Sequence, residues 1–111
     1  MQIRDEKEGT VLVLSLDGRL DTQSADAFET RLLKKIDAGD RSILVDCSGL
    51  DYMNSAGLKV FLLAAKKLQP LSGRLMLCGM TPNVYMVFEL TGFHSLFEIK
   101  PTRREALLGF T

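Results

Sequence analysis

Short apolar runs of strand length alternate along this chain with stretches whose apolar residues recur every three or four positions. A loosely alternating polar segment at residues 2–7 precedes GTVLVLSLDGRL (residues 9–20), and Gly9 between them predicts a hairpin. Three later segments are also typical of strands: SILVDC (42–47), RLMLCG (74–79) and LFEIK (96–100). Because strands separated by helices form parallel sheets through right-handed crossovers, this alternation constrains the fold more than any other feature.

Four segments between and after these strands predict helices. They run from Ser24 to Ile36, over residues 55–69, from Pro82 to Thr91, and over residues 102–110. The resulting order is β-β-α-β-α-β-α-β-α. We therefore predict an α/β fold for residues 1–111 as a single domain. It has a mostly parallel sheet, an antiparallel N-terminal strand and about four helices.

Composition excludes several classes of function. The 111 residues suffice for one core, and 14 Lys and Arg balance 14 Asp and Glu, which argues against a nucleic-acid partner. The N-terminal MQIRDEKEGT lacks the apolar region of a signal peptide, and no run reaches membrane-spanning length. We expect a cytoplasmic protein without membrane contact, as a monomer or weak dimer.

The residues that most often bind metals are few. Cys47 and Cys78 each end an apolar run, so we expect buried free thiols and no disulfide. His94 is the one histidine, and the chain has no CxxC or HxxxH pattern. The sequence therefore predicts no metal site and no cofactor.

Two loops should leave the same edge of the sheet, because parallel strands point their carboxyl ends together. They are DGRLDTQSAD (17–26) after the second strand and DCSGLDYMNSAG (46–57) after the third. Ligands and partners of open α/β sheets gather at this edge. The side chains that we expect to converge there are Asp17, Asp21, Asp46, Asp51, Asn54 and Ser55.

Ser55 could serve as a catalytic nucleophile, a helix cap or a modification site. A catalytic nucleophile is disfavoured because no GxSxG motif is present and the one histidine is distant in sequence, so we expect no enzymatic activity. The chain also lacks a phosphate-binding glycine loop. Either Asn54 or Ser55 fits a helix N-cap. Capping does not explain Gly57, which costs about 1 kcal/mol in a helix. We interpret Ala56 and Gly57 as keeping the helix start uncovered for a partner.

Ser55 is also suited to modification. A phosphate there would carry a charge of about −1.5 to −2, which the free N–H groups and the dipole of a helix start accommodate. The same charge would oppose a partner surface pressed against the loop, particularly beside Asp21 and Asp51.

Three collinear segments carry a resemblance to a known family. VDCSGLDYMNSAGLKVFLLAAKKL (45–68) resembles the central signature of STAS domains, in which a strand ends in D-x-S and M-D-S-[SA]-G-L opens a helix. GRLDTQSADAF (18–28) is similar to the family's G-x-[LI]-D segment. PNVYMVFELTGFHSLFEI (82–99) is similar to its third helix, T-G-[LF] turn and last strand. The family meant is that of the anti-sigma factor antagonists of bacterial partner-switching systems.

The resemblance implies a non-catalytic switch. In that family the unphosphorylated domain binds an anti-sigma factor that is also a serine kinase of the GHKL type, which releases the sigma factor. The kinase phosphorylates the serine that opens the second helix, here Ser55, and a PP2C-type phosphatase reverses this. Ala56 stands where a second serine often follows, and Asn54 stands where Asp is common.

The predicted partner surface centres on the start of the second helix. Tyr52, Met53 and Leu58 are its expected apolar contacts. The complete expected set is Leu20, Asp21, Thr22, Ser24, Tyr52, Met53, Asn54, Ser55, Ala56, Gly57, Leu58 and Lys59. Two alternatives stay open: a non-phosphorylated STAS subunit of a transporter or scaffold assembly, and a small nucleotide-binding domain.

Overall fold

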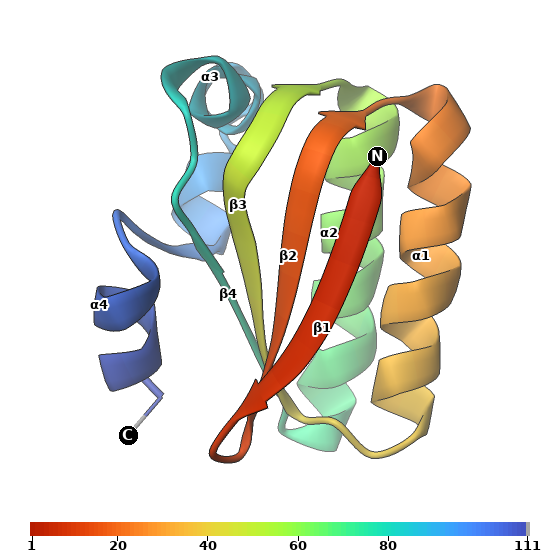
Figure 1. Ribbon diagram of the computed structural model, residues 1–111, viewed down its shortest axis with the longest axis vertical. Coiled ribbons are helices and arrows are strands. Elements are labelled where there is room, and N and C mark those ends of the chain that lie inside the picture. Colours follow the sequence, from red (N-terminus) through yellow and green to blue (C-terminus); the bar gives the residue numbers. More distant parts are fainter. Residues whose placement is uncertain (111) are drawn as a thin grey trace.

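Nine regular elements follow one another in the predicted order in the computed structural model, which describes residues 1–110 (Figure 1). The strands are β1 (Gln2–Glu8), β2 (Val11–Leu20), β3 (Ser42–Met53), β4 (Arg74–Cys78) and β5 (Glu98–Lys100). The α-helices are α1 (Thr22–Asp37), α2 (Ser55–Leu68), α3 (Pro82–Thr91) and α4 (Arg103–Leu108). Two 3₁₀ turns, η1 (Gln69–Leu71) and η2 (Phe93–Leu96), follow α2 and α3.

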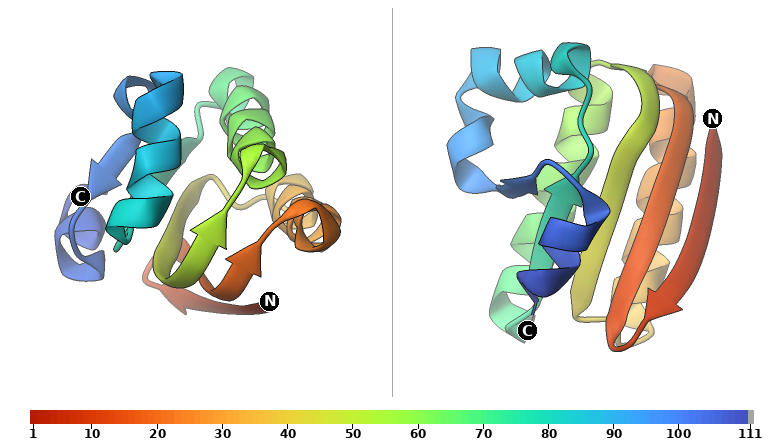
Figure 2. Two further views of the ribbon diagram at one scale, coloured as in Figure 1. Left: turned by 90° about the horizontal axis from the view of Figure 1, so that it is seen from above. Right: turned by 60° about the vertical axis from the view of Figure 1, so that its left-hand side comes forward.

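The strands form one sheet in the order β1-β2-β3-β4-β5. β1 pairs antiparallel with β2, and every other pairing is parallel, which confirms the predicted fold class. α1 and α2 lie side by side on one face of the sheet, and α4 lies on the other (Figures 1 and 2). The parallel strands therefore deliver the starts of α1 and α2 to one edge.

The main core lies between the sheet and helices α1, α2 and α3. Phe28 of α1 packs edge-on against Phe61 of α2 with ring centroids 5.4 Å apart, and Phe61 lies 5.8 Å from Phe88 of α3. A smaller apolar cluster on the opposite face joins the sheet to α4. Its fully or nearly buried members are Val11, Val13, Leu44, Met76, Cys78 and Ala106.

β3 is twice as long as expected. The sequence predicts a strand over 42–47 and a loop after it, whereas β3 continues to Met53. The register between β2 and β3 shifts at two places, and β3 gains one residue at each. The residues of β3 in the main core are Ile43, Val45, Cys47, Leu50 and Met53, so their spacing changes from two to three. Because the bulges interrupt the period-two alternation of apolar residues, the sequence pattern does not indicate a strand beyond residue 47.

Other boundaries differ from the prediction by one or a few residues. α1 begins at Thr22 rather than Ser24, because Asp21 caps it. The last strand is limited to Glu98–Lys100, since Phe93–Leu96 forms the 3₁₀ turn η2. Among residues 1–110, no helix is both long and apolar enough to cross a bilayer.

Candidate docking site at the start of helix α2

The ends of β2 and β3 hold the starts of α1 and α2 together. Leu20 and Met53 are register partners at the two strand ends. The next backbone N–H, that of Asn54, donates to the carbonyl of Leu20 at 3.2 Å. The Asn54 amide nitrogen also donates to the Thr22 hydroxyl at 3.3 Å. Residues 20–24 and 53–57 therefore form one surface at the upper edge of the sheet in Figure 1.

Each helix start has its own cap. Asn54 Oδ1 accepts hydrogen bonds from the backbone N–H groups of Ala56 (3.0 Å) and Gly57 (3.3 Å). Asp21 Oδ1 accepts from the N–H groups of Gln23 and Ser24, both at 3.1 Å, and Ser24 Oγ accepts from the Asp21 N–H at 3.0 Å. Asn54, rather than Ser55, is thus the N-cap of α2.

Ser55 is left exposed as the first residue of α2. Within residues 1–110 its hydroxyl makes no hydrogen bond, because Asn54 satisfies the N–H groups that a capping serine would bind. Thr22, Tyr52 and Lys59 are exposed as well. The side chains that are partly exposed beside them are Asp21, Ser24, Asn54 and Ala56.

Four members of the predicted partner surface are buried. Leu20, Met53 and Leu58 are at most 3% exposed and belong to the main core. The expectation that Met53 and Leu58 offer apolar contacts to a partner, and that Leu20 lies on the surface, is therefore wrong for the folded chain. The bulges of β3 turn Met53 inward, Leu20 continues the inward alternation of Leu12, Leu14 and Leu16 on β2, and Leu58 lies on the face of α2 that meets the core.

Gly57 is the fourth buried residue, and packing explains it. A Cβ at this position would lie 2.6 Å from Leu20 Cγ and 2.9 Å from Met53 Cγ. Such separations are too short for carbon atoms in contact, so only glycine lets α2 approach the strand ends this closely. The interpretation that Gly57 keeps the helix start uncovered for a partner is wrong, since the space where its side chain would lie is occupied by the buried side chains of Leu20 and Met53.

The six polar side chains expected at this edge do not all converge. Asp17 pairs with Arg4 of β1 at 3.0 Å. Asp46 is 8% exposed and pairs with Arg103 of α4 at 3.0 Å on the other face of the sheet. The prediction is wrong for these two, because β2 continues as a strand beyond Asp17 and β3 continues beyond Asp46. Asp21, Asn54 and Ser55 lie at the edge, close to the end of β3 that carries Asp51.

Asp21 carries a negative charge beside Ser55. The hydrogen bond from the Ser24 backbone N–H is the main cause that holds the Asp21 pKa below its ordinary value, and Arg19 contributes further. Its carboxylate is thus ionised at neutral pH. A second negative charge on Ser55 would add to this field, and Asn54 contributes none.

Arg19 is a residue of this edge that the sequence analysis did not single out. Its Cζ lies 4.0 Å from the centroid of the Tyr52 ring, and its Nε lies 4.0 Å from Asp21 Oδ2. Arg19 and Tyr52 are register partners only because of the second bulge in β3. No local pattern in the sequence signals that pairing.

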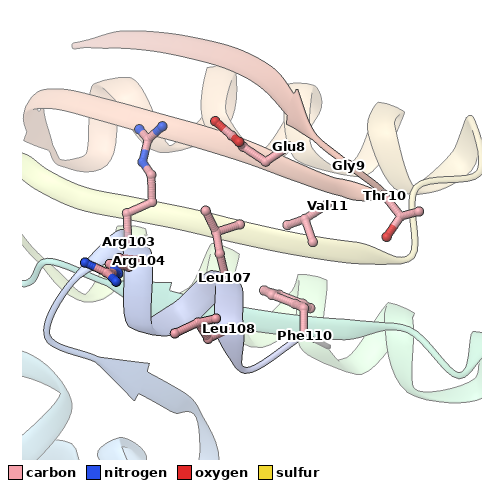
Figure 3. Close-up of a pocket in the computed structure, with 9 residues that line it drawn as sticks. All are labelled: Glu8, Gly9, Thr10, Val11, Arg103, Arg104, Leu107, Leu108 and Phe110. Carbon is pink, nitrogen blue, oxygen red and sulfur yellow. The ribbon is translucent and has the colours of Figure 1, made fainter.

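Other parts of the described chain do not compete as a chemical site. No three His, Cys, Asp or Glu side chains within residues 1–110 are grouped to hold a metal ion. A hollow of about 750 Å³ lies on the opposite face, between the β1–β2 hairpin and α4 (Figure 3). Its lining is mainly apolar, with Val11, Leu107 and Phe110 among the residues and Arg104 at its side.

Comparison with known proteins gives one consistent picture. A family model described as "STAS domain" matches residues 2–106. BtrV of Bordetella bronchiseptica, named as an anti-sigma factor antagonist, is 37% identical over 110 residues, which cover 99% of this chain and 95% of BtrV.

Solved structures share the fold over nearly the full length. A Thermotoga maritima protein, TM1081, whose crystal structure is described under the name of an anti-sigma factor antagonist, superposes with a TM-score of 0.92 at 20% identity, covering 96% of this chain and 92% of that one. The Bacillus cell fate determinant SpoIIAA in its phosphorylated form superposes with a TM-score of 0.78 at 22% identity, covering 99% and 100%.

Proposed function

The chain belongs to the STAS domain family, and from that premise we propose that it is an anti-sigma factor antagonist switched by phosphorylation of Ser55. In this proposal the unphosphorylated chain binds an anti-sigma factor and thereby frees the sigma factor. Phosphorylation of Ser55 by that anti-sigma factor, acting as a GHKL-type serine kinase, ends the binding. A PP2C-type phosphatase restores it, and all of these steps take place in the cytoplasm.

The observation that carries the proposal is the uncommitted hydroxyl of Ser55. It is exposed at the first position of α2, while Asn54 and Asp21 provide the two caps. Adding a phosphate therefore breaks no hydrogen bond of the fold. The modification changes the surface and leaves the scaffold as it is, which is what a reversible switch requires.

The charges around Ser55 favour loss of binding over rearrangement of the chain. The positive end of the α2 dipole lies at Ser55 and stabilises a phosphate on the same chain. A partner that covers this edge would have to desolvate the phosphate beside the ionised Asp21. We expect the binding free energy to fall by about 2 kcal/mol, which is close to a thirtyfold loss of affinity.

The docking surface is narrower than the one expected from sequence. We place it on the exposed side chains of Thr22, Tyr52, Ser55 and Lys59, with Asp21, Ser24, Asn54 and Ala56 between them. The buried Leu20, Met53, Gly57 and Leu58 support this surface from beneath. Protein binding, rather than catalysis, is the activity that such a surface offers.

The test is calorimetric binding to the anti-sigma factor encoded beside this protein's gene. Ser55→Ala should bind as wild type, and Ser55→Asp should bind about thirtyfold more weakly. Thr10→Asp is the matched control, since Thr10 is exposed in the hairpin turn at the opposite end of the sheet. Equal affinity of Ser55→Asp and wild type would overturn the switch.

A second measurement tests the modification itself. The wild-type chain, incubated with ATP and the same anti-sigma factor, should give a retarded band on a phosphate-affinity gel, and Ser55→Ala should not. A wild-type chain that binds the anti-sigma factor but is never retarded would instead favour the non-phosphorylated subunit of an assembly.

A further inference from the structure

Arg19 and Tyr52 form a stacked pair at the edge of the sheet that carries Ser55. They are register partners near the ends of β2 and β3, so their side chains leave the same face of the sheet. The guanidinium carbon lies 4.0 Å from the ring centroid, within the range of a cation–π contact. Both side chains are exposed.

The Arg19 guanidinium is held against the Tyr52 ring but donates no hydrogen bond to a protein acceptor within residues 1–110. Among the seven arginines of the chain, five donate hydrogen bonds to protein acceptors: Arg4, Arg31, Arg41, Arg74 and Arg103. Arg19 donates none within residues 1–110. Asp21 Oδ2 lies 4.0 Å from its Nε, beyond hydrogen-bond range, and Asp21 Oδ1 is occupied by the cap of α1.

A cation arranged in this way is suited to bind an acid. The planar guanidinium matches a carboxylate through two parallel N–H···O bonds. Because the Tyr52 ring already restricts the side chain, binding sacrifices less conformational entropy than it would at a free arginine. Arginine and tyrosine are also the residue types that most often dominate the energy of protein interfaces.

The position of the pair ties it to the docking surface. Arg19 and Tyr52 immediately precede Leu20 and Met53, whose strand ends hold Asn54 beside Thr22. The side chains of the pair point away from the main core that holds Leu20 and Met53, but Arg19 Nε lies 4.0 Å from Asp21 Oδ2, so the pair borders the docking surface.

We propose that the stacked Arg19–Tyr52 pair selects the partner by binding a carboxylate side chain on the anti-sigma factor. This inference rests on the function proposed above and adds the chemistry of the surface recognised. The partner's contact region is acidic at the point that faces Arg19.

The test compares two exposed arginines that donate no hydrogen bond within residues 1–110, Arg19 near the ends of β2 and β3 and Arg104 on α4. Arg19→Gln should weaken calorimetric binding to the anti-sigma factor encoded beside this gene about tenfold, and Arg19→Glu should weaken it further. Arg104→Glu is the matched control, because Arg104 is also exposed and lies on α4 beside the far hollow (Figure 3). Arg19→Gln should also flatten the dependence of affinity on salt concentration.

Variants of the ring separate stacking from the hydroxyl. Tyr52→Phe keeps the aromatic face and should bind the anti-sigma factor with an affinity within about twofold of wild type. Tyr52→Ala removes the ring and should show a large part of the affinity loss expected for Arg19→Gln. Thermal unfolding midpoints of all variants serve to show that they are folded.

The outcomes distinguish the two proposals. If Ser55→Asp weakens binding but both Arg19 variants bind like Arg104→Glu, the carboxylate inference is overturned and the proposed function stands. Tighter binding by Arg19→Glu would overturn the inference too, since it would indicate a basic partner surface. If the wild-type chain does not bind the anti-sigma factor at all, the proposed function fails, and the inference fails with it.

Discussion

Three residues at the start of α2 have three different roles. Asn54 caps the helix with its side-chain oxygen, Ser55 leaves its hydroxyl exposed, and Gly57 allows contact with the strand ends. The roles have different requirements: Asn54 needs a hydrogen-bond acceptor, Ser55 needs a hydroxyl that can be modified, and Gly57 must have no side chain. The crowding of small polar residues therefore reflects packing below the helix as much as recognition above it.

Gly57→Ala should destabilise the protein although alanine is the better helix former. The propensity gain of about 1 kcal/mol is outweighed by overpacking against Leu20 and Met53, which costs about 1–3 kcal/mol. Urea unfolding should therefore give a lower midpoint than wild type. Ser55→Ala, in the same helical turn but exposed, should leave the free energy of unfolding within about 0.5 kcal/mol of wild type. A more stable Gly57→Ala variant would contradict the packing argument.

At the scale of elements, the Arg103 side chain adds polar contacts to the apolar cluster that joins α4 to the sheet. The helix has six residues, of which only Ala106 is buried. Arg103 reaches from it to three strands, with donors 2.7 Å from Glu6 Oε1, 2.8 Å from Ser15 Oγ and 3.0 Å from Asp46 Oδ2. These bonds join the C-terminal helix to β1, β2 and β3, which chain connectivity alone does not do.

Arg103→Gln should lower the free energy of unfolding by about 1–3 kcal/mol, because it leaves the nearly buried Asp46 carboxylate without its cation. Arg104→Gln is the neighbouring control and should change stability little, since Arg104 is exposed. Urea unfolding monitored by circular dichroism measures both. Equal stability of the two variants would show that α4 is held by its apolar contacts instead.

The same pair predicts a dependence on pH. Burial raises the pKa of Asp46, but hydrogen bonds from Ser48 and Arg103 outweigh it and hold the pKa below the ordinary value of 3.8. The ionised carboxylate therefore contributes stability that is present above about pH 4 and is lost as the pH falls further. In Arg103→Gln the folded pKa rises, so this acid-side loss should be smaller. An unchanged pH profile in urea titrations would contradict the assignment.

At the scale of the whole molecule, the sheet separates two cores that differ in size. Cys47 faces the larger core beneath α1 and α2, and Cys78 faces the smaller one beneath α4. The two thiols lie on neighbouring strands but on opposite faces, so they cannot approach each other for a disulfide. Burial raises the pKa of both thiols, that of Cys78 to about 12.

Neither thiol should react with Ellman's reagent in the folded protein, because the thiolate is the reactive form and both side chains are fully buried. Both should react at once in concentrated guanidinium chloride. Each of the Cys47→Ser and Cys78→Ser variants keeps one thiol, so any slow reaction with the reagent can be assigned to one thiol. The rate of that reaction then measures how often the core on that face of the sheet opens. Rapid reaction of one thiol in the native protein would contradict its burial.

The order of elements and the location of Ser55 were open to prediction because both depend on local patterns. Apolar spacing separates strands from helices, and a helix start is marked by its cap and its small residues. The caps themselves were predicted only in part: Asn54 was one of two candidates, and Asp21 was placed in a loop rather than at the start of α1.

The sequence by itself determined the α/β order, the mostly parallel sheet and the edge at which Ser55 lies, since period and chain direction suffice for these. Only the tertiary structure decided that β3 continues to Met53, that Leu20, Met53 and Leu58 are buried, and that Gly57 is required by packing. It also decided that Arg19 stacks on Tyr52 and that Asp46 faces Arg103. The physical reason is that contacts between distant segments set these outcomes: two bulges in β3 turn Met53 inward and pair Arg19 with Tyr52, and no local pattern in the sequence indicates them.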